Sequence, residues 1–556
     1  MLNLEFSLTP LAMPFLFAIA LVFPAVVLWT FARGRFNEVW LLSLFAVTMT
    51  AVLLARSVAA FVLAWESMTL VSALLVATHY RRRDVRRAAF AYLVISQLGA
   101  LCVIVALAML ATHAETFSFS GIAGAARTLP KPMRLWILAL SLVGFGSKAG
   151  IVPLHFWLPR AHPAAPANAS ALLSGVMLGI ALFGMMQMTE ALAAPVPASF
   201  ALITLGIGAV TATLGGLYAA IETDIKQLLA YSSIENVGIV VAALGLAELA
   251  GRLGVASIAG LALVAAFFHV ISHAIFKSLL FLVAGVVADA NGTTDLEHLG
   301  GLARTLRFSA AFAFVGCLAA AALPPTVGFA SEWFVFRSFI EATVTGPQLL
   351  RMASIFALTA VVFGTAFAAL AYLKLFGVGF LGASQSTHQS DELERADSSA
   401  ASIGWLALAT LIVGLLPAFV LDPLAHVVRQ LGFMPPELGS LPALPTLLTL
   451  LPLAGAFASL IAGTGFSGTR VRRANTWTCG SPVPVRSKYT ATAFANPIVI
   501  IFTPALRFDV DDVVRTIAAG VRRIALRLRI VQGGLLRVYL AYAVIALVIV
   551  LVVAAQ

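Results

Sequence analysis

The sequence has few charged residues and very few cysteines for its length. Acidic and basic side chains make up only 11% of its 556 residues. The three cysteines, Cys102, Cys317 and Cys479, lie far apart and form no C-x-x-C pair, which excludes the usual iron–sulfur and zinc motifs from this chain. A composition that is 61% hydrophobic, with a mean hydropathy of +1.00, excludes a soluble globular domain.

Long apolar windows follow one another from residue 11 to residue 554. They predict an all-α polytopic membrane protein with about 14 transmembrane helices. The net charge of +11 does not indicate nucleic-acid binding, because the basic residues cluster at helix ends. The first 35 residues lack a basic n-region and a small-residue cleavage site, so we expect the opening apolar run to remain as a helix.

Two of the expected helices are interrupted by glycine and proline, at Gly146–Pro153 and at Leu323–Gly328. Such breaks persist at membrane depth only inside the protein or beside a water-filled cavity, and transporters place ion sites at them. A packing kink is the alternative for any single proline. Because an ionisable residue accompanies each break, the pattern favours an ion site.

One long apolar segment carries three titratable residues at one-turn spacing: His269, His273 and Lys277. Residues four apart form a stripe on one face of a helix. A charged side chain at the centre of a membrane helix costs roughly 2.5–3.5 kcal/mol, so such a stripe favours a proton relay. A polar patch that joins helices is the main alternative. A zinc pair is a weaker one, because no third ligand is nearby.

Other ionisable residues also fall where little water is expected. Glu66 and Glu332 lie in apolar helices, Lys148 lies at the first break, and Lys374 lies near a helix end, where a lysine usually reaches to the interface. Desolvation and neighbouring charges tune such groups, so a Glu66–Lys148 pair within ion-pair reach is expected. Another pair, Lys226 and Glu235, would occupy opposite faces of one helix and need separate partners.

Lysine and arginine clusters, among them residues 81–87 and 470–473, fall on one side of the membrane if the N-terminus is periplasmic. The loop at 127–134 is also basic but would lie on the periplasmic side, which is contrary to this orientation. Residues 500–530 interleave arginine and aspartate with apolar residues. This pattern predicts an amphipathic helix at the membrane surface or along a partner, followed by a last span.

Several motifs together resemble the antiporter-like, proton-translocating subunits of respiratory complex I and of multisubunit cation/proton antiporters. They are Gly144–Pro159 (G-F-G-S-K-A-G-I-V-P-L-H-F-W-L-P), His162–Gly175, Asp224–Gly238, the histidine–lysine stripe and Leu323–Trp333. Within that superfamily, the chain resembles hydrogenase-4 component B and the formate hydrogenlyase membrane subunit most. That closer resemblance lies in Arg160–Pro163, Ile234–Asn236, Ser331–Trp333, Trp477–Gly480 and Tyr489–Thr492.

The resemblance implies a role for each ionisable residue. Glu66 and Lys148 match the input half-channel, and Glu332 matches the exit-side residue. Lys226 and the stripe match the central hydrophilic axis, with Glu235 and Lys374 beside it. The implied domains are N-terminal helices (1–57), a proton-translocation core (58–380), additional helices with a cytoplasmic linker (381–499), and a lateral helix with its anchor (500–556).

Two departures from the family pattern stand out. The lysine expected after Ser174–Met177 is Gly179, and Leu178–Met186 holds no ionisable group. The N-terminus also reaches Glu66 earlier than in relatives, as if two opening helices were absent. We expect the surroundings of Gly179 to be apolar and the central passage to be weakened, or rerouted through Lys277, Lys374 and Glu332.

The resemblance implies a membrane subunit of a complex-I-like or group-4-hydrogenase-like oxidoreductase in the cell inner membrane. Such a chain conducts protons coupled to redox chemistry in its partners and is not itself catalytic. It binds no cofactor; iron–sulfur, nickel–iron or flavin centres would belong to a cytoplasmic redox arm, beside other membrane subunits. The alternatives are a cation/proton antiporter subunit, a subunit for inorganic-carbon uptake and a non-pumping scaffold.

Overall fold

The computed structural model describes residues 4–192, 196–382, 394, 397–439, 455 and 489–506. Residues 1–498 form one compact unit and residues 499–556 another. Apart from isolated bridges, the described residues form helices joined by turns. Two apolar windows in the sequence, 443–463 and 534–554, are also expected to be spans. These windows and the expected lateral helix and anchor fall wholly or mostly outside the described residues.

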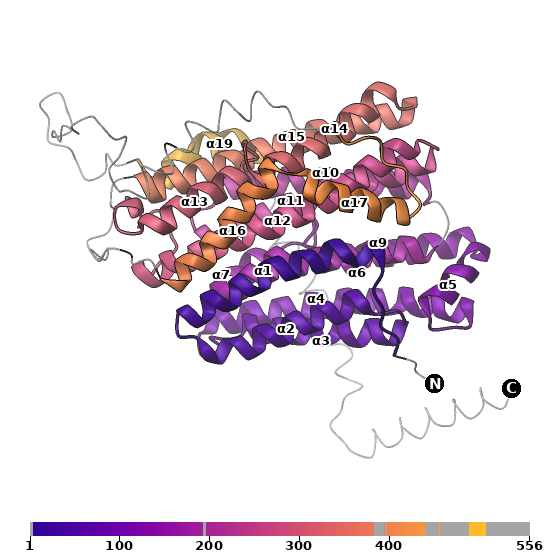
Figure 1. Ribbon diagram of the computed structural model, residues 1–556, viewed down its shortest axis with the longest axis horizontal. Helices are drawn as coiled ribbons and strands as arrows, with labels where there is room; N and C mark the ends of the chain where they lie inside the picture. The colour runs from indigo at the N-terminus through magenta and orange to yellow at the C-terminus, as the bar shows by residue number, and fades with distance from the viewer. Residues whose placement is uncertain are drawn as a thin grey trace, which may run out of the picture. The chain divides into compact units, whose positions relative to one another are not determined.

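The helices of the larger unit run side by side (Figure 1). Their bounds are α1 Met13–Ala32, α2 Phe36–Leu54, α3 Val58–Val76, α4 Arg83–Ala114, α5 Phe119–Ala125, α6 Lys131–Ala149, α7 Leu158–Ala164, α8 Ala167–Leu172, α9 Leu178–Ala191, α10 Ala198–Ile221, α11 Ile225–Arg252, α12 Ala256–Asn291, α13 Arg307–Ala320, α14 Val327–Thr345, α15 Gln348–Lys374, α16 Ser398–Leu415 and α17 Ala418–Gln430. A further helix, α19, covers Ala491–Leu506.

Ten helices among the described residues are long and apolar enough to cross a membrane. The all-helical membrane fold is therefore confirmed, whereas the total of about 14 spans stays a prediction. Two spans, Ala167–Ala191 and α12, are the inner ones, because the 18-residue windows that define them are entirely buried. Outer helices expose large apolar side chains such as Phe90 (69%) and Phe356 (71%), as expected for surfaces that face lipid.

Both predicted helix breaks are present. α6 ends at Ala149, and Gly150 follows with a φ of 82°, the left-handed conformation that glycine adopts readily at a helix end. α13 ends at Ala320, and α14 begins after the double proline, at Val327. Two further irregularities were not expected: Leu173–Met177 forms a π-helical turn between α8 and α9, and Leu375–Leu381 forms another directly after α15.

α10 and α11 pack closely through glycines. Gly208 and Gly215 on α10, and Gly238 and Gly245 on α11, are seven residues apart on each helix. A Cβ added at any of the four would lie 2.2–2.4 Å from a backbone nitrogen of the opposite helix. This backbone contact holds Glu235 directly opposite Gly215.

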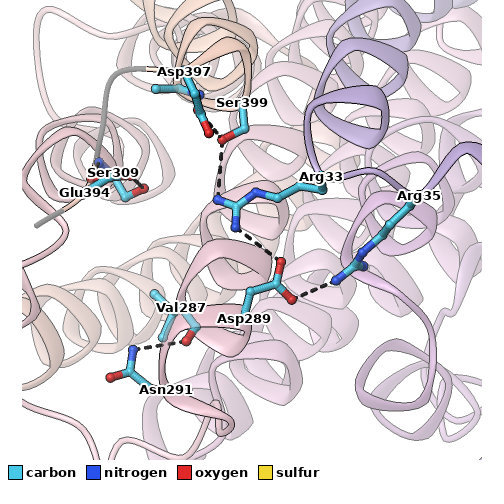
Figure 2. A network of polar contacts seen from close by, with 10 residues as sticks. Arg33, Arg35, Val287, Asp289, Asn291, Ser309, Glu394, Asp397 and Ser399 are labelled. Carbon is cyan, nitrogen blue, oxygen red and sulfur yellow. Dashed lines mark hydrogen bonds and ion pairs between the residues drawn. The ribbon is translucent and has the colours of Figure 1, made fainter. Parts of the chain in front are cut away.

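A network of charged residues joins the ends of α1, α12 and α16 (Figure 2). Asp289 accepts bonds from Arg33 at 3.4 Å and from Arg35 at 2.7 Å. The Arg33 guanidinium also donates to Ser399 at 3.4 Å, and the Ser399 hydroxyl donates to Asp397 at 2.6 Å. The network fixes α1 against α12 at one end of the bundle.

The glycine contact predicts a large difference between two substitutions on α10. Gly208→Ala would press a methyl group into the backbone of α11, whereas the Cβ of Gly206→Ala meets nothing within 4 Å. Overpacking of this kind costs about 1–3 kcal/mol. We expect Gly208→Ala to lower the unfolding midpoint measured in detergent, with Gly206→Ala close to the native protein. Equal midpoints would contradict the packing argument.

Candidate functional site

The three stripe residues of α12 lie inside the protein, where the sequence predicted them. The exposed fractions of His269 and Lys277 are 0%, and that of His273 is 6%. Neighbouring helices surround them: α11 and α14 pack on α12 together with α1, α8 and α13. The stripe therefore lines the interior of the bundle rather than a lipid-facing surface.

Neutral oxygens hold the Lys277 ammonium. Its Nζ donates to the Tyr372 hydroxyl at 2.6 Å, to the Ser232 hydroxyl, and to the Leu229 carbonyl at 3.4 Å. The hydroxyls of Ser232 and Tyr372 are also bonded to each other. α11 and α15 thus contribute to one cluster around the lysine of α12.

His269 connects three helices through its ring. Nδ1 lies 3.1 Å from the hydroxyl of Ser331 in α14, and Nε2 lies 3.0 Å from Oδ1 of Asn236 in α11. The Asn236 amide donates to the Ser232 carbonyl at 2.7 Å and also to the Glu235 carboxyl. Because a carbonyl only accepts, these bonds fix the amide orientation, and Nε2 of His269 must donate. Nδ1 is left as the acceptor.

Two buried groups beside this cluster lack a hydrogen-bond partner among the described residues: Nε2 of His273 and Oε2 of Glu332. Buried polar atoms in proteins are nearly always hydrogen-bonded, to protein or to water. Glu332 follows Ser331 directly, near the start of α14 and just after the second helix break.

Lys148 lies in a second buried cluster. Its Nζ donates to the Tyr92 hydroxyl at 2.6 Å and to Thr69 at 3.1 Å, and Tyr92 also bonds Ser72 at 2.5 Å. The expected ion pair with Glu66 is wrong. Glu66 is half-buried and accepts from Gln97 at 2.9 Å. Thr69, about one turn further along α3, takes the place of the carboxylate beside the ammonium.

The remaining predicted lysines bond backbone carbonyls. Lys226 donates to Ala165 at 2.9 Å, apart from Glu235, so those two residues have separate partners as expected. Lys374 is fully buried and donates to Ala220 at 2.6 Å and to the carbonyl of Glu222, in the loop that follows α10. Lys374 therefore caps the C-terminal end of α10.

The surroundings of Gly179 are apolar, as the sequence predicted. A Cβ placed there would lie 3.2 Å from Val270 and 3.6 Å from Phe15. The Phe15 ring also packs edge-on against Phe183 and Phe267. A wall of aromatic and aliphatic side chains from α1, α9 and α12 thus occupies the position of the expected lysine.

Sequence reasoning missed the neutral partners of the titratable groups. They are Thr69, Ser72, Tyr92, Ser232, Asn236, Ser331 and Tyr372. A signal existed for one pair, since Ser232 and Asn236 lie within one turn of Glu235 on α11. The zinc alternative finds no support in the geometry of His269, because Asn236 and Ser331 occupy both of its ring nitrogens.

The chain resembles known membrane subunits along most of its length. A family model described as NADH:quinone oxidoreductase/Mrp antiporter, TM matches residues 55–368, more than half of the chain. Hydrogenase-4 component B of Escherichia coli is 30% identical over 94% of this chain and 83% of its own length. The chain belongs to this antiporter family. An uncharacterized protein of Mycobacterium tuberculosis is 35% identical over 92% of this chain and 86% of its own length.

Solved structures share the fold of this chain. A chain of the membrane-bound sulfane sulfur reductase, an archaeal respiratory membrane complex, matches with a TM-score of 0.80 and 28% identity, over 98% of this chain and 89% of that one. A chain of the Mrp complex from a Dietzia species, at 23% identity over 99% of this chain and 56% of that one, shows the same fold with a TM-score of 0.71. The family match covers every predicted site residue except Lys374.

The Lys148 cluster predicts a loss of stability when one hydroxyl is removed. Tyr92→Phe takes away a side-chain partner of a buried ammonium, which costs about 1–3 kcal/mol. We expect its unfolding midpoint in detergent to fall below that of Tyr80→Phe, a control whose ring is 61% exposed. Equal midpoints for the two variants would show that the Lys148 ammonium does not depend on this bond.

The loop between α10 and α11 predicts a pH dependence of stability. Burial raises the pKa of Glu222 to about 7, an effect that Lys374 opposes and Asp224 strengthens. Protonation is therefore favoured in the folded state, and the stability it adds is full below the ordinary carboxyl pKa and is lost as pH rises through about 7. We expect Glu222→Gln to flatten the fall in unfolding midpoint over this window. Glu437→Gln, in an exposed residue, should leave the fall intact.

Proposed function

We propose that this chain conducts protons as a membrane subunit of a complex-I-like or group-4-hydrogenase-like oxidoreductase. The observation that carries the proposal is the buried series of polar side chains centred on α11. It runs from Ser331 through His269 to Asn236 and Glu235, with the Lys277 cluster joined to it at Ser232. Membership of the antiporter family supports the same function.

The geometry gives each residue a task in proton transfer. Lys277 bonds only neutral oxygens, so it can give up its proton without leaving a carboxylate unpaired. The fixed Asn236 amide sets the His269 tautomer and turns the free lone pair of Nδ1 toward Ser331. A proton taken up at Nδ1 makes the ring cationic, and the same nitrogen can give a proton back through the Ser331 hydroxyl.

The proposal extends to the surroundings of the chain. We place it in the cell inner membrane with a periplasmic N-terminus, among about 14 helices in all, and with residues 500–530 as a surface helix along a neighbouring membrane subunit. Redox chemistry, and any iron–sulfur, nickel–iron or flavin centre, would belong to a cytoplasmic arm. The names of relatives such as formate hydrogenlyase subunit 3 of Escherichia coli support this assignment.

A non-pumping scaffold is the second candidate, and the apolar wall at Gly179 favours it. In a proton pathway, groups or waters must follow one another at hydrogen-bond spacing. Phe15 and Val270 interrupt that spacing at the position of the expected lysine. Direct passage from the Lys148 cluster to α12 at this point is therefore closed, and conduction requires another approach to Lys277.

Proton uptake into liposomes that contain the whole complex tests conduction. We expect Lys277→Ala to reduce proton flux about 100-fold, because removing a positioned proton carrier typically costs 10²–10⁴ in rate. Lys131→Ala is the matched control, since this lysine is exposed at the start of α6. If Lys277→Ala and Lys131→Ala leave flux equally unchanged, the chain is a scaffold rather than a conductor.

A further inference from the structure

His162 is a buried titratable residue that the pathway described above does not use. Its exposed fraction is 0%, and neither ring nitrogen has a hydrogen-bond partner among the described residues. A fully buried imidazole with both nitrogens unpaired is rare, because buried polar atoms are normally bonded. An apolar side chain would fill this site without leaving two polar atoms unpaired. We therefore look for a function of the imidazole beyond packing.

The position of this ring continues the stripe on α12. Phe281 follows Lys277 by four residues, as Lys277 follows His273, and the His162 ring packs on Phe281 with centroids 4.9 Å apart. Ser278 in the same turn of α12 donates to the Ala171 carbonyl at 3.0 Å, so the segment after His162 runs along this helix. His162 thus lies beside the turn of α12 that follows Lys277.

Lys226 approaches the same segment from the other side. It donates to the carbonyl of Ala165, three residues after His162. Lys226 is the second residue of α11 and 9% exposed, so it lies at the end of the bundle rather than in its centre.

Resting on the proposed conduction, we propose that His162 relays protons between Lys226 and Lys277. This route for protons begins at Lys226, at the start of α11. It passes His162, in the segment before α8, and ends at Lys277, the last residue of the stripe. It avoids Gly179, where Phe15 and Val270 close the direct approach. The imidazole takes a proton on one ring nitrogen and releases one from the other, so the ring returns to its neutral form.

The test measures proton flux in liposomes with the whole complex, for His162→Gln, Lys226→Ala, the double variant and Lys277→Ala. His426→Gln is the control, because His426 is exposed on α17. We expect His162→Gln to lower flux about 100-fold. Its unfolding midpoint should change only by the loss of the ring contact with Phe281, since no hydrogen bond of the ring to the protein is lost. The double variant should lose no more than the stronger single one, because both residues serve one route.

Three results would overturn the relay: unchanged flux in His162→Gln, losses that multiply in the double variant, or a fall in flux matched by a fall in unfolding midpoint. His162→Asn provides a second variant if His162→Gln fails to assemble. The failure of the proposed function is a separate result, since Lys277→Ala would then equal the native complex. Loss of flux in Lys277→Ala with none in His162→Gln would reject the relay alone.

Discussion

The free energy required to bury an ammonium or a carboxylate in a membrane protein governs the interior of this chain. A buried charge needs several compensating bonds. Four buried lysines donate hydrogen bonds to hydroxyl or carbonyl oxygens, which offset the cost of burying the charge. They are Lys148, Lys226, Lys277 and Lys374. Within the described residues, the ion pairs join partly exposed side chains, such as Arg35 and Asp289. Neutral partners stabilise an ammonium without fixing it in the charged form, which suits a group that must exchange its proton.

Backbone irregularities supply the room and the polar atoms that these clusters use. The first break follows Lys148 by two residues, and the second precedes Ser331 and Glu332. The π-helical turn Leu173–Met177 brings Ser174 to within 2.6 Å of Ser233 on α11. Elsewhere close packing is the rule, as the glycine contacts between α10 and α11 illustrate. The interior is thus regular where helices only need to pack and irregular where polar groups meet.

The sequence predicted the stripe on α12 and both glycine–proline breaks, because helical period and backbone chemistry are local properties. The sequence could not predict which oxygen atoms accept hydrogen bonds from each buried ammonium. Glu66 and Thr69 are about one turn apart on α3, and only the packing of α3 on α4 and α6 decides that Lys148 bonds Thr69. The partners of Lys374 are carbonyls more than 150 residues earlier in the chain, so their proximity depends on tertiary structure alone.

Gly179, which stands where the family pattern has a lysine, and Phe15 together make this part of the interior apolar. The Phe15 ring and Val270 lie beside the position that a side chain at residue 179 would enter, and these apolar groups offer no polar partner to an ammonium there. A lysine introduced there would displace an aromatic contact and bury its charge among Val270, Phe183 and Phe267, at a cost of several kcal/mol. The apolar wall is therefore a stable property of the fold and not a single missing side chain. The proposed conduction therefore needs another approach to Lys277, and His162 is a buried titratable residue beside the next turn of α12.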